Sequence, residues 1–411
     1  MRILYLHQYF NTPRMAGSTR SYEMARRLVH MGHEVQMVSS WREESASTGW
    51  FTTDEEGIVV HWIPVGYSNS MSYARRIEAF FRFAIQAARK ASSLPADIVF
   101  ATSTPLTIVL PGAYVARRQN VPMVLEVRDL WPEVPIAVGA LRNPIMRYMG
   151  RLLERFAYRH AERIVALSPD MQAGIVGRGY PEEKIAVIPN GADPEMFMPD
   201  EKRALRVRKE FPEFGEGPVI MYAGTLGKIN GVEYFVRLAA EFLREGSNCR
   251  FVIIGSGREW DMVTALAEEL GVLNESLLMY RPMPKEKLAQ VLSAATVTTS
   301  LTIDLPELEA NSANKFFDGL AAGAPVVINY GGWQEKLLVG TRSGIRLDRD
   351  IHRACKQLST LIGDQELCRR MGENARRLAI ERFSFDRLAG SLERVIAGAG
   401  ASQGIESVNQ S

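Results

Sequence analysis

A short polar segment at the start of an apolar, helix-like stretch carries the side chains best suited to chemistry. Asn311, Ser312 and Asn314 come before Lys315, and Asp318 follows one helical turn later. Such residues cap helices well, and the unpaired N–H groups and dipole at a helix start attract anions. Lys315 would add a positive charge, and Asp318 could accept hydrogen bonds from neighbouring hydroxyls. This combination indicates a phosphate beside a sugar; the alternative is an ordinary exposed ion pair between Lys315 and Asp318.

Two further loops in the same half of the chain place glycines directly after β-prone runs. One follows the run VIMY at 219–222 and the other follows the run FVII at 251–254. Glycine lets a backbone approach a phosphate closely, and N–H groups with one ammonium can neutralise its charge. Because the carboxyl ends of parallel strands share one edge of a sheet, we expect both loops beside the 311–318 segment. The residues of these loops are Gly224, Thr225, Gly227, Lys228, Gly231, Gly255 and Gly257.

The N-terminal half offers candidates at the ends of its own predicted strands. Gly17 and Ser18 follow the first strand, where a glycine would let a ligand come close, although a plain strand-to-helix turn explains it equally well. Asp129 lies in EVRDLWPE after another strand, at the edge where doubly wound domains keep their chemistry. We favour Asp129 as a catalytic-side acid; the alternative is a helix N-cap ahead of Trp131.

Alternating β-prone runs and amphipathic segments must position these residues. They predict an α/β fold of two doubly wound, Rossmann-like parallel-sheet domains, at 1–198 and 199–382. Residues 200–218 are charged and contain glycine and proline, so they are predicted to form a linker, a lead-in helix and a hinge, with a second hinge at 383–385. A helix over 383–400 is predicted to return to the first domain, and 401–411 to form a disordered tail.

Composition limits the class of protein. With 411 residues and 46% hydrophobic content, the chain can build two cores. Forty-nine basic against 47 acidic residues leave a net charge of +2, which excludes a nucleic-acid binder driven by bulk charge. The three cysteines lack zinc-like spacing, so a cytoplasmic chain with reduced thiols and no metal site is expected.

Two basic segments, 72–91 and 142–163, mix aromatic residues with arginines. Amphipathic helices of this kind often lie on anionic membranes, whereas core helices with arginines extending from their edges give the same pattern. No run of 18 apolar residues occurs, and MRILYLHQYF has the character of a first strand rather than a signal peptide. The protein is therefore expected to be soluble, or peripheral on the inner face of the cytoplasmic membrane.

Motifs occur in a fixed order along nearly the whole chain. MRILYLHQYF, GSTRS and GHEV stand at its start, followed by LSPDMQ, KIAVIPNGADPEMF, YAGTLGKINGVEYFV, FVIIGSGRE, NKFFDGLAAGAPVV and ERFSFDRLAGSLERV. This order resembles the retaining nucleotide-sugar glycosyltransferases of the GT-B fold, known as glycosyl transferases group 1. That family includes sucrose and glycogen synthases and bacterial polysaccharide glycosyltransferases. The resemblance implies two domains that face each other across a cleft.

The resemblance also implies roles for residues of the C-terminal half. Asp318 stands where the family usually has the glutamate that binds the donor ribose. Lys315 and Lys228 look like the basic residues on the diphosphate. Arg281 and Met283 look like part of the loop whose backbone meets the nucleobase. The donor site implied by motif and resemblance together comprises Gly17, Ser18, Thr225, Gly227, Lys228, Gly255, Arg281, Met283, Glu309, Asn311, Asn314, Lys315 and Asp318.

Other positions match the family less well. Gly17 matches a loop that borders donor and acceptor, and Asp129 with Arg128 sits where many relatives carry a His-Asp pair near the donor sugar. The E-x7-E pattern of the family requires an acid at Ala310, so its first glutamate is Glu309, Glu307 or missing. The usual Arg and Lys of the first glycine loop are Thr225 and Asn230. These departures leave the donor sugar open.

The implied activity is transfer of a hexosyl or hexosaminyl group from a nucleotide-diphosphate sugar, with uridine as the favoured base. The acceptor would be a saccharide or a polyprenyl-diphosphate-linked sugar of a bacterial surface polysaccharide. Asp129, Lys228 and Lys315 are the expected catalytic residues, and no metal or other cofactor is required. The alternatives are a sugar-nucleotide epimerase of the same architecture and a non-catalytic nucleotide-sugar-binding subunit.

Overall fold

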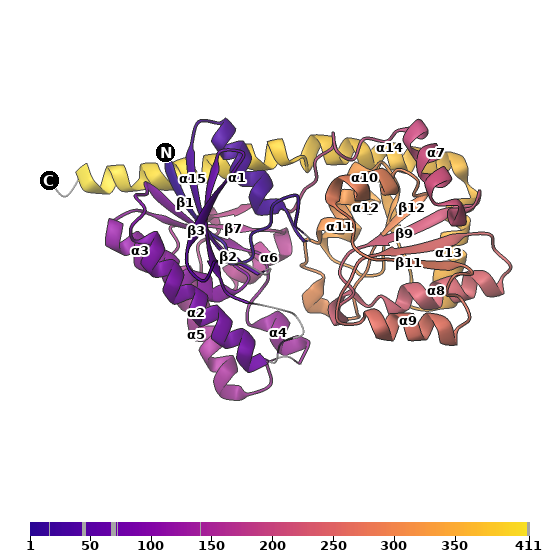
Figure 1. Ribbon diagram of the computed structural model, residues 1–411, viewed down its shortest axis with the longest axis horizontal. Coiled ribbons are helices and arrows are strands. Elements are labelled where there is room, and N and C mark those ends of the chain that lie inside the picture. Colours follow the sequence, from indigo (N-terminus) through magenta and orange to yellow (C-terminus); the bar gives the residue numbers. More distant parts are fainter. Residues whose placement is uncertain (16, 43–46, 67–70, 72, 140, 409–411) are drawn as a thin grey trace. The chain divides into compact units, whose positions relative to one another are not determined.

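The computed structural model describes residues 1–15, 17–42, 47–66, 71, 73–139 and 141–408 (Figure 1). The chain divides into two compact units. Unit 1 contains residues 1–12, 17–189 and 386–411, and unit 2 contains 13–16 and 190–385. Apart from the short segment 13–16, the chain therefore has two main passages between the units, near 189/190 and near 385/386, while sequence composition had placed the first boundary at 198.

The described part of unit 1 holds an eight-stranded sheet in the order β3-β4-β2-β1-β5-β6-β7-β8. Every neighbouring pair is parallel except β3 and β4. The strands are β1 Arg2–Leu6, β2 Glu34–Trp41, β3 Phe51–Glu55, β4 Ile58–Pro64, β5 Ile98–Thr102, β6 Met123–Val127, β7 Arg163–Ala166 and β8 Ile185–Val187. The helices are α1 Arg20–His30, α2 Tyr73–Ala91, η1 Leu106–Ile108, α3 Val109–Gln119, α4 Glu133–Ala137, α5 Pro144–His160, α6 Pro169–Val176, η2 Glu182–Lys184 and α15 Phe385–Val408.

The described residues of unit 2 form a six-stranded parallel sheet in the order β11-β10-β9-β12-β13-β14. The strands are β9 Val219–Ala223, β10 Arg250–Ile254, β11 Leu277–Tyr280, β12 Val297–Ser300, β13 Val326–Ile328 and β14 Gly344–Arg346. The helices are α7 Glu201–Glu210, η3 Pro212–Phe214, η4 Lys228–Asn230, α8 Glu233–Arg244, α9 Trp260–Glu269, α10 Lys285–Leu292, η5 Pro306–Leu308, α11 Asn314–Ala321, α12 Trp333–Thr341, α13 Ile351–Gly363 and α14 Gln365–Arg382.

Both sheets follow from buried β-branched and aromatic runs. The strands β1, β5 and β6 are buried almost throughout, as expected for central strands covered on both faces. In unit 2, Phe316 and Phe317 of α11 are fully buried in an apolar core that also contains residues of β9, β10 and β13. The start of α11 is thereby fixed at the carboxyl edge of its sheet.

The structure refines the sequence-based expectations about three elements. Residues 200–218 contain a helix as predicted, α7, but they are not a free linker, because Val207 and Phe214 are buried in the core of unit 2. The tail predicted to be disordered from Ala401 is helical to Val408, since α15 continues through residues that include good helix formers. The doubly wound sheet of unit 1 carries one antiparallel edge strand, because β3 runs antiparallel to β4.

Helix α15 belongs to unit 1. Arg27 of α1 forms an ion pair with Asp386 of α15, with 2.5 Å between Nε and Oδ1. Leu388, Leu392 and Ile396 are buried along the same helix. Within unit 2, the two chain passages are joined to each other, because Ala192 N–H donates to Phe383 O and Phe385 N–H donates to Ala192 O.

Candidate active site

The start of α11 in unit 2 has no side-chain cap. The N-cap position is Ala313, and none of the three N-cap candidates from the sequence fills it. Ser312 instead accepts a hydrogen bond from the backbone N–H of Asn190 at 3.0 Å. The first-turn N–H groups of α11 therefore lack a side-chain acceptor, which is the arrangement that suits an anion.

Lys315 reaches from α11 to the glycine loop that follows β9. Its Nζ donates to Asn230 Oδ1 at 2.6 Å and lies 5.2 Å from the ring centroid of Tyr222. A Cβ added at Gly224 would lie 3.4 Å from Lys315 Cδ, so the lysine stem passes directly over that glycine. Burial lowers the pKa of Lys315 to about 8. The structure thus brings together Lys315, the start of α11 and the glycine loop.

The two glycine loops of unit 2 interlock through their backbones. Leu226 N–H donates to Ser256 O at 2.9 Å, and a Cβ on Gly255 would lie 1.9 Å from Gly224 O. A Cβ on Gly257 would lie 2.2 Å from Leu226 O. Glycine is therefore required here by the packing of one loop on the other, a reason that the sequence did not reveal.

Asp318 does not pair with Lys315. Its carboxylate accepts a hydrogen bond from Lys285 Nζ of α10 at 2.5 Å, and it is 6% exposed. Burial raises the pKa of Asp318, and the ammonium of Lys285 opposes that shift. The alternative of an exposed ion pair between Lys315 and Asp318 is therefore wrong.

The remaining donor-side candidates of unit 2 lie around the same edge. Thr225 and Lys228 are exposed on the first glycine loop, and Asn314 is half-buried at the start of α11. Arg281 stacks on Trp260 with 4.0 Å between its guanidinium carbon and the ring centroid, and Met283 packs on the core.

A turn of two glycines surrounds Glu309. A Cβ on Gly331 would lie 2.8 Å from Glu309 Oε1, and one on Gly332 would lie 2.8 Å from Glu309 O. Asn311 O accepts a hydrogen bond from Trp333 Nε1 at 3.0 Å, which holds the segment between Glu309 and α11. Ala310, which stands at the position of the missing family acid, is buried, and Glu309 directly precedes it in the chain.

In unit 1, Asp129 follows β6 and is partly buried. Burial raises its pKa to about 6, while Arg128 and a hydrogen bond from Thr104 oppose that shift. Asp129 is not a helix cap, because the N-cap of α4 is Pro132, without a side-chain hydrogen bond. Gly17 has a φ of 131°, and a Cβ there would lie 2.6 Å from Asn11 Nδ2, so the loop passes tightly over Asn11.

Sequence reasoning missed three residues that hold the site. Asn230 was noted only as a departure from the family pattern, yet it accepts the hydrogen bond of Lys315. Lys285 lies 33 positions from Asp318, so no local spacing indicates the pair. Asn190 Nδ2 also donates to Ser312 O, and its place in the IPNGAD motif was the one available signal.

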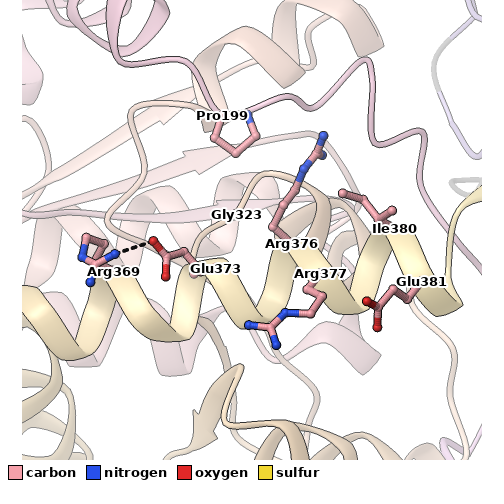
Figure 2. A pocket seen from close by; sticks show the side chains of 9 residues that line it. Pro199, Gly323, Arg369, Glu373, Arg376, Arg377, Ile380 and Glu381 are labelled. Atoms are coloured by element: carbon pink, nitrogen blue, oxygen red, sulfur yellow. Dashed lines mark hydrogen bonds and ion pairs between the residues drawn. The ribbon is translucent and has the colours of Figure 1, made fainter.

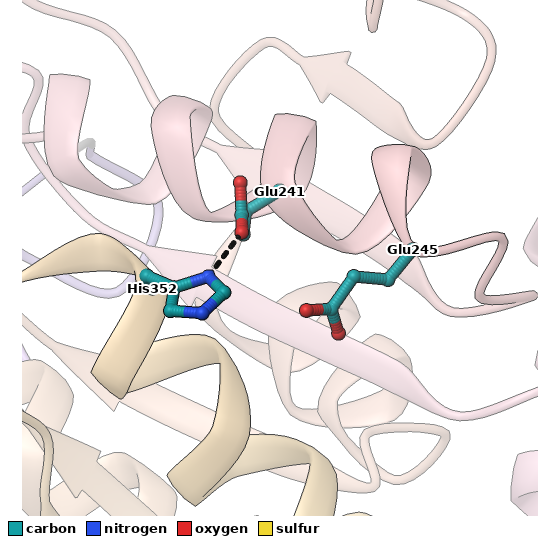
Figure 3. Close-up of side chains that lie close together, drawn as sticks. All are labelled: Glu241, Glu245 and His352. Atoms are coloured by element: carbon teal, nitrogen blue, oxygen red, sulfur yellow. Dashed lines mark hydrogen bonds and ion pairs between the residues drawn. The ribbon is translucent and has the colours of Figure 1, made fainter.

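A cluster away from this site could coordinate a cation. Glu241 of α8, Glu245 at the C-cap of that helix and His352 of α13 bring their ligand atoms within 4.8 Å of one another (Figure 3). Glu241 is already bonded to His352 Nδ1 at 2.8 Å and to Arg244 at 2.5 Å. Its carboxylate charge is therefore compensated, and the cluster acts as a contact between two helices.

Unit 2 also has a pocket of about 500 Å³ beside α14 (Figure 2). Its charged lining is engaged in the fold: Arg369 pairs with Glu366 and Glu373, and Arg376 donates to Ala321 O at 2.7 Å. The lining residues are Pro199, Gly323, Arg369, Gly372, Glu373, Arg376, Arg377, Ile380 and Glu381.

Comparison with known proteins identifies the family. Residues 16–191 match the family described as "Glycosyl transferase 4-like domain", and residues 205–378 match "Glycosyl transferases group 1". The chain belongs to the group 1 glycosyltransferases. The family and the GT-B fold expected for this group 1 chain are both confirmed.

Solved structures share the fold of this group 1 chain at low sequence identity. Sucrose-phosphate synthase from Thermosynechococcus elongatus superposes with a TM-score of 0.77 and 15% identity, covering 98% of this chain and 99% of that one. HepE from Anabaena, in complex with UDP and glucose, superposes with a TM-score of 0.74 and 15% identity, covering 97% and 100%.

Curated relatives of the group 1 chain match over part of their length. A D-inositol 3-phosphate glycosyltransferase from Nocardia farcinica is 28% identical over 269 residues, which are 63% of this chain and 57% of the relative. A GDP-mannose-dependent alpha-(1-6)-phosphatidylinositol monomannoside mannosyltransferase from Mycolicibacterium smegmatis is 22% identical over 307 residues, covering 73% and 75%. The match thus spans little more than half of the first relative.

Proposed function

We propose that this chain is a retaining glycosyltransferase that moves a hexosyl or hexosaminyl group from a UDP-sugar to a sugar hydroxyl. The acceptor would be a lipid-linked saccharide of a bacterial surface polysaccharide. The proposed donor site is supported above all by Lys315, which lies at the uncapped start of α11 beside the backbone of the Gly224 loop. A half-buried ammonium and free N–H groups at one sheet edge suit a diphosphate.

The chemistry follows from charge at that edge. When the bond between sugar and diphosphate breaks, negative charge develops on the leaving phosphate, and a leaving phosphate can accept the proton of the attacking hydroxyl. Lys315, Lys228 and the start of α11 would stabilise this charge electrostatically, so no metal is required by this mechanism. We propose Asp129 of unit 1 as a further catalytic residue.

The choice of UDP is supported by HepE, whose structure holds UDP and glucose, whereas the mycobacterial mannosyltransferase is named for GDP-mannose. A thermal-shift panel of nucleoside diphosphates distinguishes the bases. A ligand present at 100 times its dissociation constant adds roughly 2.7 kcal/mol to the free energy of unfolding. UDP is expected to give the largest shift, and a larger shift with GDP would overturn the uridine assignment.

The decisive variant is Lys315→Met, compared with Lys336→Met as an exposed lysine in the same unit. Loss of a charge-stabilising group of this kind costs roughly 100- to 1,000-fold in kcat. We expect Lys315→Met to lose turnover and UDP affinity, and Lys336→Met to keep both. If Lys315→Met keeps both, the proposed donor site is wrong.

Two other outcomes would identify the alternative functions. Conversion of the sugar of a UDP-sugar in the absence of any acceptor would identify an epimerase. Binding of a UDP-sugar without transfer to any acceptor would identify a non-catalytic binding subunit.

We further propose that α2 and α5 of unit 1 lie on an anionic membrane. The side chains of Ile145, Tyr148, Met149 and Leu152 are exposed with helical spacing on α5, as are those of Phe81 and Ile85 on α2. Exposed arginines flank both rows, including Arg82, Arg89, Arg151 and Arg155. An exposed apolar row beside basic residues suits the boundary of an anionic bilayer. No helix in the described parts of the chain is long and apolar enough to span a membrane.

Vesicle sedimentation tests this surface. The protein should sediment with vesicles containing phosphatidylglycerol more than with phosphatidylcholine alone, because the attraction is partly electrostatic. The double variant Tyr148→Ser, Leu152→Ser should lose binding, while Met262→Ser, an exposed apolar residue of unit 2, should not. Equal binding of the two variants would contradict the membrane contact.

A further inference from the structure

A group of polar residues in unit 1 surrounds the Gly17 loop at the carboxyl ends of β1, β5 and β6. Because β1 lies between β2 and β5, successive connections run to opposite sides at this point of the sheet. Open α/β sheets bind ligands at such a switch point. The group consists of His7, Asn11, Ser18, Arg42 and Arg128, and we call it the loop cluster.

Hydrogen bonds link Arg42, Asn11, Ser18 and Arg128 of the loop cluster in one arc. Arg42 donates to Asn11 Oδ1, and Asn11 Nδ2 donates to Ser18 O at 3.2 Å. Arg128 Nη2 donates to Ser18 Oγ at 3.3 Å. The guanidinium of Arg128 thus donates to a neutral hydroxyl beside the Gly17 loop.

Arg128 has no carboxylate within ion-pair distance among the residues that the structure describes. The neighbouring acid Glu126 is already bound by Arg20, with both side chains fully buried and 2.8 Å between Nη2 and Oε1. Asp129 is bonded to Thr104. A guanidinium with five donors and one long hydrogen bond to a hydroxyl has capacity left for an anion.

His7 provides an independent observation. It is only 3% exposed, and its Nδ1 has no hydrogen-bond partner in the described part of the protein. Buried polar atoms are nearly always satisfied, so an unsatisfied one indicates a missing ligand or water. Arg128 and Arg42 lie close enough to His7 that, with burial, they hold the pKa of its imidazole well below the usual range.

Backbone strain marks the same place. Thr104, which follows β5, has a φ of 106°, a value that β-branched residues rarely adopt. Such strained positions cluster at ligand-binding sites. Ser103 beside it accepts a hydrogen bond from the backbone N–H of Arg128 at 2.9 Å, which fixes the base of the arginine.

We propose that Arg128 and His7, with Arg42 beside them, bind a phosphate group of the acceptor substrate. This inference rests on the proposed glycosyl transfer, and it specifies an acceptor that carries a phosphate or diphosphate near the reacting sugar. The donor also carries a diphosphate, so the same chemistry has two sources. An acceptor site must accept its phosphate while the donor site is filled.

Calorimetric titration of pyrophosphate into the full-length protein saturated with UDP separates the two sources. Pyrophosphate should bind under these conditions, and Arg128→Met should weaken it by roughly tenfold or more because a charge-assisted contact is lost. Arg128→Lys, which keeps the charge but loses the planar fork, should show an intermediate loss. Arg117→Met, an exposed arginine of α3, is the matched control and should behave as the native chain.

Two results would overturn the acceptor subsite. One is competition between pyrophosphate and UDP, with Arg128→Met weakening UDP instead; the phosphate would then be that of the donor. The other is unchanged pyrophosphate affinity in a folded Arg128→Met variant, with folding checked by its urea midpoint. Failure of the donor proposal would give a different result, namely no UDP binding to the native chain. In that case pyrophosphate is titrated without UDP, and the affinities of the Arg128 and Lys315 variants show which of the two residues binds it.

Discussion

At the scale of single residues, the surroundings of Lys315 make its charge available to a ligand. Its stem lies over Gly224, its ammonium bonds Asn230, and no carboxylate of the described residues forms an ion pair with it. An ammonium held by a neutral amide keeps its charge available for a ligand. The lowered pKa is the electrostatic consequence of the same burial.

This residue gives a pH prediction. The pKa of Lys315 in the protein is about 8, and the charged form is the one that binds a diphosphate. UDP affinity should therefore be full near pH 7 and fall as the pH rises through about 8, by up to tenfold for each pH unit. Lys315→Arg stays charged in this range and should give a flat profile. Calorimetry between pH 7 and 9.5 measures both, and a flat profile for the native chain would contradict the assignment.

The residue scale also shows what the sequence could reveal about the site. Lys315, Asp318 and the glycines of the 224–231 loop could be proposed from the sequence because they lie at the ends of recognisable strands or helices. The partners Asn230 and Lys285 were not assigned as partners, because each depends on a contact made only after folding. The capping prediction for α11 failed because Ser312 was bound by Asn190, more than 100 positions away in the chain.

At the scale of elements, interlocked loops build the carboxyl edge of the unit 2 sheet, where we propose the donor site. The 224–226 backbone lies against Gly255 and Gly257, so the loops after β9 and β10 form one layer. Strand ends and glycines were visible in the sequence, whereas this packing was not. The edge strand β3 was missed because its residues FTTDE alternate exposed and half-buried positions instead of forming an apolar run.

Gly255→Ala tests the interlocked loops. The added Cβ would lie 1.9 Å from Gly224 O, so the backbone must shift, at a cost of about 1–3 kcal/mol in the free energy of unfolding. UDP affinity should fall with it. Gly340→Ala is the matched control, because a Cβ there meets nothing within 4 Å and lies within α12, where alanine is favoured by about 0.5–1 kcal/mol. Urea unfolding and UDP calorimetry measure the two effects.

The buried pair of Arg20 and Glu126 ties three elements of unit 1 together. Arg20 begins α1, Glu126 lies in β6, and the guanidinium also donates to Ile188 O at 2.9 Å after β8. Arg20→Met would leave a buried carboxylate without its charge partner, which costs about 3–5 kcal/mol. The urea midpoint should fall far more than for Arg2→Met, which breaks the exposed pair with Asp97. Equal shifts for the two variants would contradict this role.

At the scale of the whole molecule, the architecture was largely predictable and its boundaries were not. Two doubly wound units follow from alternating strand and helix patterns. The segment 200–218 was predicted to be a linker with a lead-in helix; the helix is present as α7, and Val207 and Phe214 are buried in unit 2. A few apolar residues that are buried in a core can therefore determine the structure of a segment whose composition is mostly charged.

A truncation tests the assignment of α15 to unit 1. A chain ending at 385 loses the buried side chains of Leu388, Leu392 and Ile396, each worth about 1.5–3 kcal/mol of burial. Unit 1 should then unfold or become sensitive to protease, while a fragment covering unit 2 persists. A chain ending at 401 keeps these residues and should resist protease as the full chain does. Resistance of unit 1 in the shorter chain would contradict the prediction.

The hydrogen bonds of Ala192 with Phe383 and Phe385 place both chain passages at one point of unit 2. A nick in the backbone near 189 would therefore not release two independent pieces. The C-terminal piece would carry α15, whose contacts lie in the N-terminal piece. The two pieces would therefore bind each other again when α15 packs on the same apolar surface. We therefore expect two separately synthesised segments, divided near residue 189, to associate through the last helix.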